Sequence, residues 1–145
     1  MKERGQQSSY YPVFLNVRGN KCVVVGGGQV TLRKVMALLE CGAHIQVISP
    51  HLCPELAQLV ENGEISALLK EYQTGDFEHA FVAIVATDSS EINRQIAEET
   101  RSKAILVNVV DDAESSDFIV PSFMRRGDVT IAVSTGGRSP ALARK

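Results

Sequence analysis

The chain lacks the features that would direct it to a membrane, a secretory route or a nucleic acid. Its cysteines, Cys22, Cys41 and Cys53, include no CxxC pair, and an odd number of thiols favours a reducing compartment. No apolar run approaches the roughly 20 residues of a membrane helix, and the N-terminal MKERGQQSSY has no apolar signal stretch. The net charge of -2 argues against a general basic field for nucleic acid. These absences predict a cytoplasmic protein.

Patterns typical of strands alternate with patterns typical of helices along most of the 145 residues. Hydrophobic content of 44% and charged content of 22% are ordinary for a globular protein. Alternation of this kind implies right-handed crossovers and a parallel sheet. We therefore expect an α/β fold, a Rossmann-type parallel sheet with helices on both faces and strand order 3-2-1-4-5. The expected strands are Lys21–Val25, His44–Ile48, Ile65–Leu69, Phe81–Ala86 and Ile105–Val110, and the expected helices are Val30–Cys41, Glu55–Glu61 and Ser90–Arg101.

The pattern predicts three segments: a mobile tail over residues 1–10, the Rossmann-type domain over 11–112, and a different segment over 113–145. Strands are expected at 118–120 and 129–134 in the last segment. Ser139-Pro140 is a good helix start, but only ALARK follows it. One turn is too short to stand alone, so we expect the natural protein to continue.

Three glycines join the first expected strand to the first expected helix. Gly26 allows a tight turn, and Gly28 lets backbone approach a phosphate. The N–H groups of Gln29 and Val30 would then face the anion, as they do at dinucleotide sites. The bare alternative is a glycine-rich turn without a ligand. We favour a dinucleotide cofactor bound at Gly26, Gly27, Gly28, Gln29 and Val30.

The acidic residue that usually binds the cofactor's ribose is missing at the end of the second strand. That stretch reads QVISPH and contains neither Asp nor Glu. Ser49 is expected to hydrogen-bond a ribose hydroxyl, and Pro50 and His51 to pack near the adenosine. His51 would equally attract the extra phosphate of NADP, so residue chemistry leaves NAD against NADP open.

Polar residues follow the fourth and fifth strands, at the edge where open parallel sheets bind ligands. Thr87 is expected beside the cofactor, whereas Asp88 has a simpler reading as a helix cap. Asp111 is the candidate acid or base, with a turn-capping aspartate as its alternative. Asn108 is expected to orient the cofactor or Asp111, although a turn-forming role is equally open.

Several stretches, taken in order, resemble one enzyme family. They are YPVFLNVRGNKCVVVGGGQVTLRK, AIVATDSSEIN, VNVVDD, SDFIVPS and AVSTGGRSPALAR. Together they are similar to the precorrin-2 dehydrogenase / sirohydrochlorin ferrochelatase family, the N-terminal module of sirohaem synthase. The likeness runs from Tyr11 to the last residue. The glycine turn is generic, whereas NVVD and STGGRSPALAR are specific to the family.

The resemblance implies oxidation of precorrin-2 to sirohydrochlorin, with NAD as the hydride acceptor despite the missing ribose carboxylate. Some members also insert ferrous iron to give sirohaem. The family's central aspartate corresponds to Asp111. Members are usually homodimers, in which the segment after the NAD domain forms the interface and a helical C-terminal region completes the substrate cleft. This implies that residues 113–145 are a dimerisation segment.

A polycarboxylate substrate needs cationic or N–H partners. Arg125 and Arg138 are candidates because guanidinium pairs with carboxylate through two hydrogen bonds. The alternative for each is a solvated surface position or a dimer contact without a role in substrate binding. Ser134 and Thr135 are expected to contribute an anion-binding nest, or else a bare turn. His51 and Cys53 alone do not predict a metal site. The rival function is an NAD(H)-sensing regulatory domain without catalysis.

Overall fold

The computed structural model describes residues 9–135 of the chain, which fall into two compact units. Residues 16–117 form the sheet unit, and residues 9–15 and 118–135 belong to the hairpin unit. No helix among the described residues is long and apolar enough to cross a membrane.

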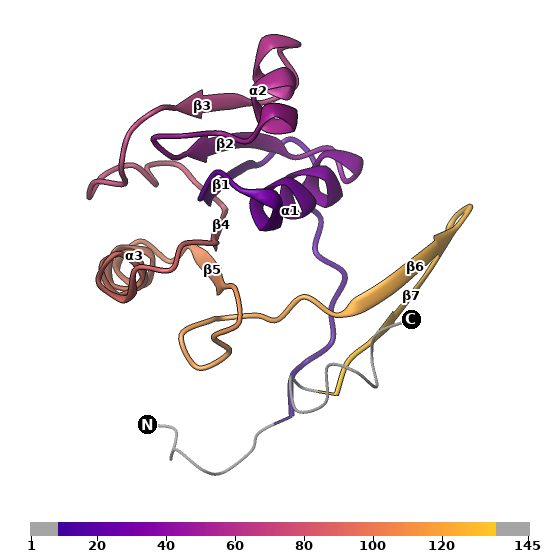
Figure 1. Cartoon of the computed structure of the whole chain (residues 1–145). Coiled ribbons are helices and arrows are strands. Elements are labelled where there is room, and N and C mark those ends of the chain that lie inside the picture. Colours follow the sequence, from indigo (N-terminus) through magenta and orange to yellow (C-terminus); the bar gives the residue numbers. More distant parts are fainter. Residues whose placement is uncertain (1–8, 136–145) are drawn as a thin grey trace. The chain divides into compact units, whose positions relative to one another are not determined.

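The sheet unit is a five-stranded parallel sheet in the order β3-β2-β1-β4-β5. This confirms the predicted fold class and strand order. Figure 1 shows α1 and α2 on one side of the sheet and α3 on the other, as right-handed crossovers from a central strand require. The elements are β1 (Lys21–Val25), α1 (Gln29–Glu40), β2 (His44–Ile48), α2 (Pro54–Glu61), β3 (Ser66–Leu68), β4 (Val82–Val85), α3 (Ser90–Ser102) and β5 (Leu106–Val109).

The central strands are almost entirely apolar because helices or connecting segments cover both of their faces. All four residues of β4 are buried, as are the last four of β1. Alternate residues of the strands, such as Val85 and Val107, pack into one core with Ile96 of α3 and with Phe77 of the β3–β4 connection. The intervening residues face the side that carries α1.

The hairpin unit contains two antiparallel strands, β6 (Ser122–Arg126) and β7 (Val129–Val133). Gly127, at φ 57, allows the tight turn between them. The strand predicted at 118–120 is wrong, because regular pairing begins only after Pro121. Proline carries no N–H for a ladder, and directly before the predicted strand the Asp117 N–H donates to the Val107 carbonyl, so the chain is still attached to β5 there.

Candidate cofactor and substrate site

The glycine turn leads directly from β1 into α1 and packs against the end of β2. Gly26 has φ 131, a conformation that favours glycine, and its N–H donates to the Ile48 carbonyl at 3.0 Å. A Cβ on Gly27 would lie 1.8 Å from the His51 carbonyl oxygen. Only glycine therefore fits at these two positions, for reasons internal to the fold.

Gly28 differs from its neighbours because a Cβ there would meet nothing within 4 Å. It is the N-cap of α1 and supplies no side-chain hydrogen bond to the helix. The first N–H groups of α1, including those of Gln29 and Val30, have no acceptor within the helix. Open space beside these groups is the geometry that a pyrophosphate needs, so the turn fits the predicted dinucleotide.

The segment after β2 is held against the glycine turn by backbone bonds. The Cys53 N–H donates to the Gly27 carbonyl at 2.8 Å. The Ser49 hydroxyl donates to the His51 carbonyl at 2.8 Å and accepts the His51 N–H at 3.4 Å. Ser49 thus keeps acceptor capacity for a ribose hydroxyl, but its proton is engaged within its own loop. Pro50 and His51 are exposed at the same edge.

Thr87 lies in the connection from β4 to α3. Its hydroxyl accepts the Ser89 N–H at 3.0 Å, and its carbonyl accepts from the Asn93 side chain at 3.3 Å. The cap of α3 is Ser89, whose hydroxyl accepts the Ile92 N–H at 3.3 Å, and not Asp88. Asp and Ser are comparable caps, so composition could not decide between adjacent positions.

Asp111 occupies the tip of a tight turn that follows β5. The Val110 N–H donates to Val85 at 2.9 Å, and the Asp112 N–H donates back to Val109 at 3.0 Å. Asp111 itself has φ 64, which aspartate tolerates better than most residues do, and it is exposed. The turn therefore presents its carboxylate at the carboxyl edge of the sheet, near the end of β4.

Asn108 lies within β5 opposite Ile84 and is 7% exposed. Its position in the alternation places it on the α1 side of the sheet, away from the core that Val107 and Val109 share with α3. The side-chain amide of Asn108 is therefore a buried polar group on the α1 side of β5, three residues before Asp111.

Beyond β5, the acidic segment 111–117 folds back along the edge of the strand. The Asp117 carboxylate accepts the Val107 N–H at 3.0 Å, and the Ser116 hydroxyl accepts the Val109 N–H at 2.8 Å. These contacts cover an edge strand and fix the turn that carries Asp111. The sequence had no periodic signal for them.

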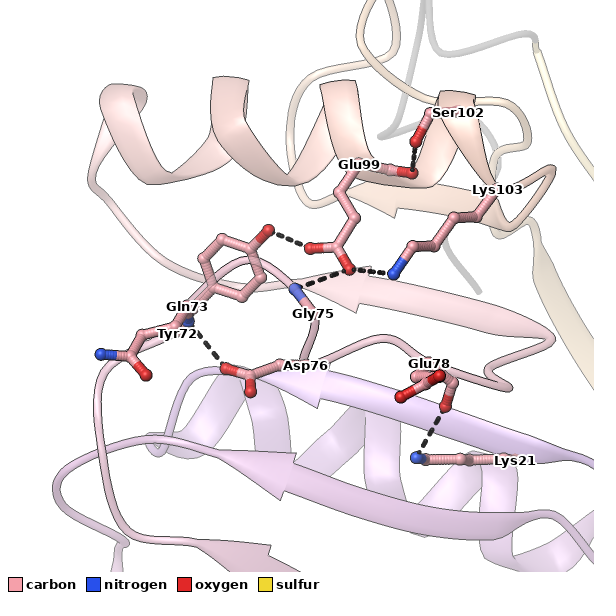
Figure 2. Close-up of polar contacts among 9 residues, drawn as sticks. All are labelled: Lys21, Tyr72, Gln73, Gly75, Asp76, Glu78, Glu99, Ser102 and Lys103. Carbon is pink, nitrogen blue, oxygen red and sulfur yellow. Dashed lines mark hydrogen bonds and ion pairs between the residues drawn. The ribbon is translucent and has the colours of Figure 1, made fainter.

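A second polar cluster lies at the opposite edge of the sheet, at the C-terminal end of α3 (Figure 2). Glu99, 6% exposed, accepts hydrogen bonds from the Tyr72 hydroxyl, the Gly75 N–H and the Lys103 ammonium. Burial raises the pKa of Glu99, but these hydrogen bonds outweigh it and the net shift is downward. The cluster joins the β3–β4 connection to α3 and is remote from the glycine turn.

The predicted substrate-binding residues lie outside the sheet unit. Arg125 of β6 stacks its guanidinium over the Phe123 ring at 5.1 Å. Ser134 and Thr135 follow β7, and Arg138 lies outside the described residues. Between residues 9 and 135 no group of three His, Cys, Asp or Glu side chains is arranged to hold a metal ion.

Three further positions lie at the cofactor edge, and the sequence indicated only the first of them. Thr31 replaces the third glycine of the usual motif, is 1% exposed, and has a hydroxyl without a hydrogen-bond partner in the described part of the chain. The Cys53 backbone N–H holds the 49–53 loop against the glycine turn by its hydrogen bond to Gly27. Lys34 lies within electrostatic range of Asp111. The sequence shows the departure of Thr31 from the GxGxxG pattern, whereas it has no signal for these roles of Cys53 and Lys34.

Comparison with known proteins yields two family matches. Residues 13–122 match the family described as putative NAD(P)-binding, and residues 126–145 match the sirohaem biosynthesis protein central family. The first match covers most of the chain and the whole five-stranded sheet. It supports the predicted nicotinamide dinucleotide cofactor, NAD.

Similar proteins agree with these matches. The chain is 45% identical over 135 residues to a siroheme synthase of Chromobacterium violaceum and 42% identical over 135 residues to one of Nitrosococcus oceani. Each alignment covers 93% of this chain and 29% of the relative. The solved structure of SirC, precorrin-2 dehydrogenase, superposes with a TM-score of 0.82 at 28% identity, covering 92% of this chain and 66% of that one. The resemblance seen in the motifs is confirmed, and the chain belongs to the putative NAD(P)-binding family.

Proposed function

We propose that this chain catalyses the NAD-dependent oxidation of precorrin-2 to sirohydrochlorin in sirohaem synthesis. The observation that carries the proposal is the pairing of two features at one sheet edge. The open cradle at Gly28 fits a dinucleotide, and Asp111 is presented on a fixed turn two strands away. The names of the similar proteins supply the substrate class.

The cofactor is held by backbone at one end and by the 49–51 loop at the other. The N–H groups at the start of α1 receive the pyrophosphate, and the helix dipole favours its negative charge. The ribose meets the Ser49 oxygen in place of a carboxylate. When bound, NAD accepts a hydride from the substrate. The residues assigned to the cofactor are Gly26, Gly27, Gly28, Gln29, Val30, Ser49, Pro50, His51, Thr87 and Asn108.

Asp111 takes the proton that the reaction releases. Oxidation of the macrocycle removes one hydride and one proton, so a base near the ring completes the step. An exposed carboxylate at the tip of a turn can receive this proton and return it to water. Asn108, buried on the same side of the sheet, orients the site without titrating.

The substrate's carboxylates bind to Arg125, Arg138, Ser134 and Thr135, and the reaction takes place in the cytoplasm. Arginine matches a carboxylate through two parallel hydrogen bonds, which suits a substrate with several of them. Insertion of ferrous iron into the product, with the ion as a substrate, is the second activity that the family resemblance implies.

The chain acts as a homodimer through its hairpin unit. One side of the hairpin carries Met124, Val129, Ile131 and Val133, which are 52%, 59%, 54% and 52% exposed. An isolated two-stranded hairpin is only marginally stable in water, and an exposed apolar face of this kind is normally buried against a partner. Light scattering after size exclusion should report a dimer, and Ile131→Asp should shift it toward monomer.

The central experiment is an anaerobic assay with precorrin-2 and NAD that follows NADH and the pigment spectrum in wild type and Asp111→Asn. Asparagine tolerates the left-handed conformation of residue 111, so the fold should survive. We expect turnover to fall by about 10²- to 10⁴-fold while NAD affinity is unchanged. Asp112→Asn, which retains the oxygen that accepts the Ser115 N–H, is the matched control.

Two outcomes would contradict the proposal. An Asp111→Asn variant with wild-type turnover would remove Asp111 from the chemistry. Wild-type protein that binds NAD but forms no NADH with precorrin-2 would favour the regulatory domain that senses NAD(H).

A further inference from the structure

Lys34 lies in the second turn of α1, on one flank of the buried side of the helix. Thr31 and Val35 are the fully buried residues of α1, and Lys34 is partly buried beside them. Long side chains on a helix extend back toward its N-terminus. The ammonium of Lys34 is therefore carried toward the carboxyl edge of the sheet, where the glycine turn begins.

A chain of close contacts connects this flank of α1 to Asp111. A Cβ on Gly26 would lie 2.7 Å from both the Thr31 hydroxyl and the Ala86 carbonyl, so α1, β1 and the end of β4 converge at this glycine. The carbonyl of Val85, the residue before Ala86, accepts the Val110 N–H, and Asp111 is the residue after Val110. Thr31 and Lys34 are three residues apart and so share a face of the helix.

The effect of Asp111 on the pKa of Lys34 is consistent with this proximity. Burial lowers the pKa of Lys34, Arg33 lowers it further, and Asp111 opposes both. Nevertheless, the described residues give Lys34 neither a hydrogen bond nor an ion pair, and they give the Asp111 carboxylate none either. The helix thus keeps a partly desolvated cation close to a carboxylate without joining the two.

We infer that Lys34 is a further substrate-binding residue, whose ammonium receives a peripheral carboxylate of the tetrapyrrole and so places the ring against Asp111. This rests on the proposed function. A partly buried ammonium is a stronger partner for an anion than an exposed one, because less water competes for it. One face of α1 would then serve both molecules, the cofactor at its N-terminus and the substrate one turn later.

The test compares Lys34→Gln, Lys34→Arg and the exposed control Arg33→Gln in the full-length protein. Initial NADH formation is measured over a range of precorrin-2 at saturating NAD, and NAD affinity is measured by calorimetry. We expect Lys34→Gln to raise KM for precorrin-2 about tenfold or more, the loss of one hydrogen bond to a charged group. Lys34→Arg should restore most of the affinity, and NAD binding should not change.

A merely structural lysine would give a different pattern. Wild-type KM in Lys34→Gln, or an equal loss in Arg33→Gln, would overturn the assignment, and so would weakened NAD binding in Lys34→Gln. If the wild type makes no NADH, the proposed function fails separately. Titration with uroporphyrin, an octacarboxylate, then decides the role of Lys34 alone, since binding unaffected by Lys34→Gln would refute it.

Discussion

Glu99→Gln should destabilise the sheet unit although it changes only one atom of a residue far from the cofactor edge. The carboxylate is the common acceptor for Tyr72, Gly75 and Lys103 (Figure 2). A glutamine keeps one oxygen, and its amide nitrogen faces a donor. The backbone N–H of Gly75 cannot turn round, whereas the Tyr72 hydroxyl can.

The magnitude follows from these partners. The amide oxygen therefore stays with Gly75, and what is lost is the charge of the acceptor: a hydrogen bond to a charged group contributes about 1.5–3 kcal/mol and a neutral one about 0.5–1.5 kcal/mol. Lys103 is 40% exposed at its side chain and loses only a screened pairing, about 0.5 kcal/mol. The Tyr72 hydroxyl can turn and accept a hydrogen bond from the amide nitrogen of the glutamine, so this contact adds little to the loss of stability. We therefore expect a loss of about 1.5–2 kcal/mol in the free energy of unfolding at pH 7.

The pH dependence gives the sharper test. The pKa of Glu99 is depressed in the folded state, because the three hydrogen bonds outweigh the effect of burial. Its contribution is complete above the unfolded value of about 4.3 and is lost as pH falls through the lower folded value. The gap between wild type and Glu99→Gln should therefore narrow on acidification from pH 7 toward about pH 3.

Urea unfolding followed by circular dichroism measures this gap, with the exposed neighbour as the control in Glu98→Gln. The control should stay within about 0.5 kcal/mol of wild type. If Glu99→Gln loses no more than the control, or if its deficit is the same at both pH values, the network does not have the role that its geometry indicates.

Two further substitutions test the cofactor edge. Gly27→Ala should reduce NAD affinity by at least tenfold in calorimetry, because a Cβ 1.8 Å from the His51 carbonyl forces the 49–53 loop away; unchanged affinity would show that the loop moves freely. Thr31→Val should leave thermal stability unchanged or raise it by about 1 kcal/mol, because the hydroxyl it removes has no partner within residues 9–135; a clear loss in the melting curve would reveal a bond that the hydroxyl makes.

The parallel sheet was predictable because its information is local and redundant. An uninterrupted apolar run such as FVAIVA specifies a strand buried on both faces, and alternation with helices specifies parallel order. The hairpin was less predictable. Its strands are largely exposed, so Phe118 to Val120 looked more like a strand than the observed Ser122–Arg126.

The candidate site divides in the same way. Gly26 to Gly28 were predictable because a strand, a glycine turn and a helix form one contiguous signal. The turn that holds Asp111 depends on Ser116 and Asp117 bonding back to β5, and such contacts leave no period in the sequence. Lys34 was missed because a charged residue on the flank of an amphipathic helix normally indicates solvent.

The missing ribose carboxylate has a physical counterpart in the packing at the end of β2. Ser49 lies so close to the glycine turn that its oxygen would be 2.6 Å from a Cβ on Gly27. The same segment is tied to that turn at Gly26 and at Cys53. A longer acidic side chain at position 49 would therefore need either the hydroxyl's place against Gly27 or a displaced loop. The tight contact between the glycine turn and the loop thus favours a short neutral side chain at position 49. The ribose is then recognised by the position of the backbone and not by a charged side chain.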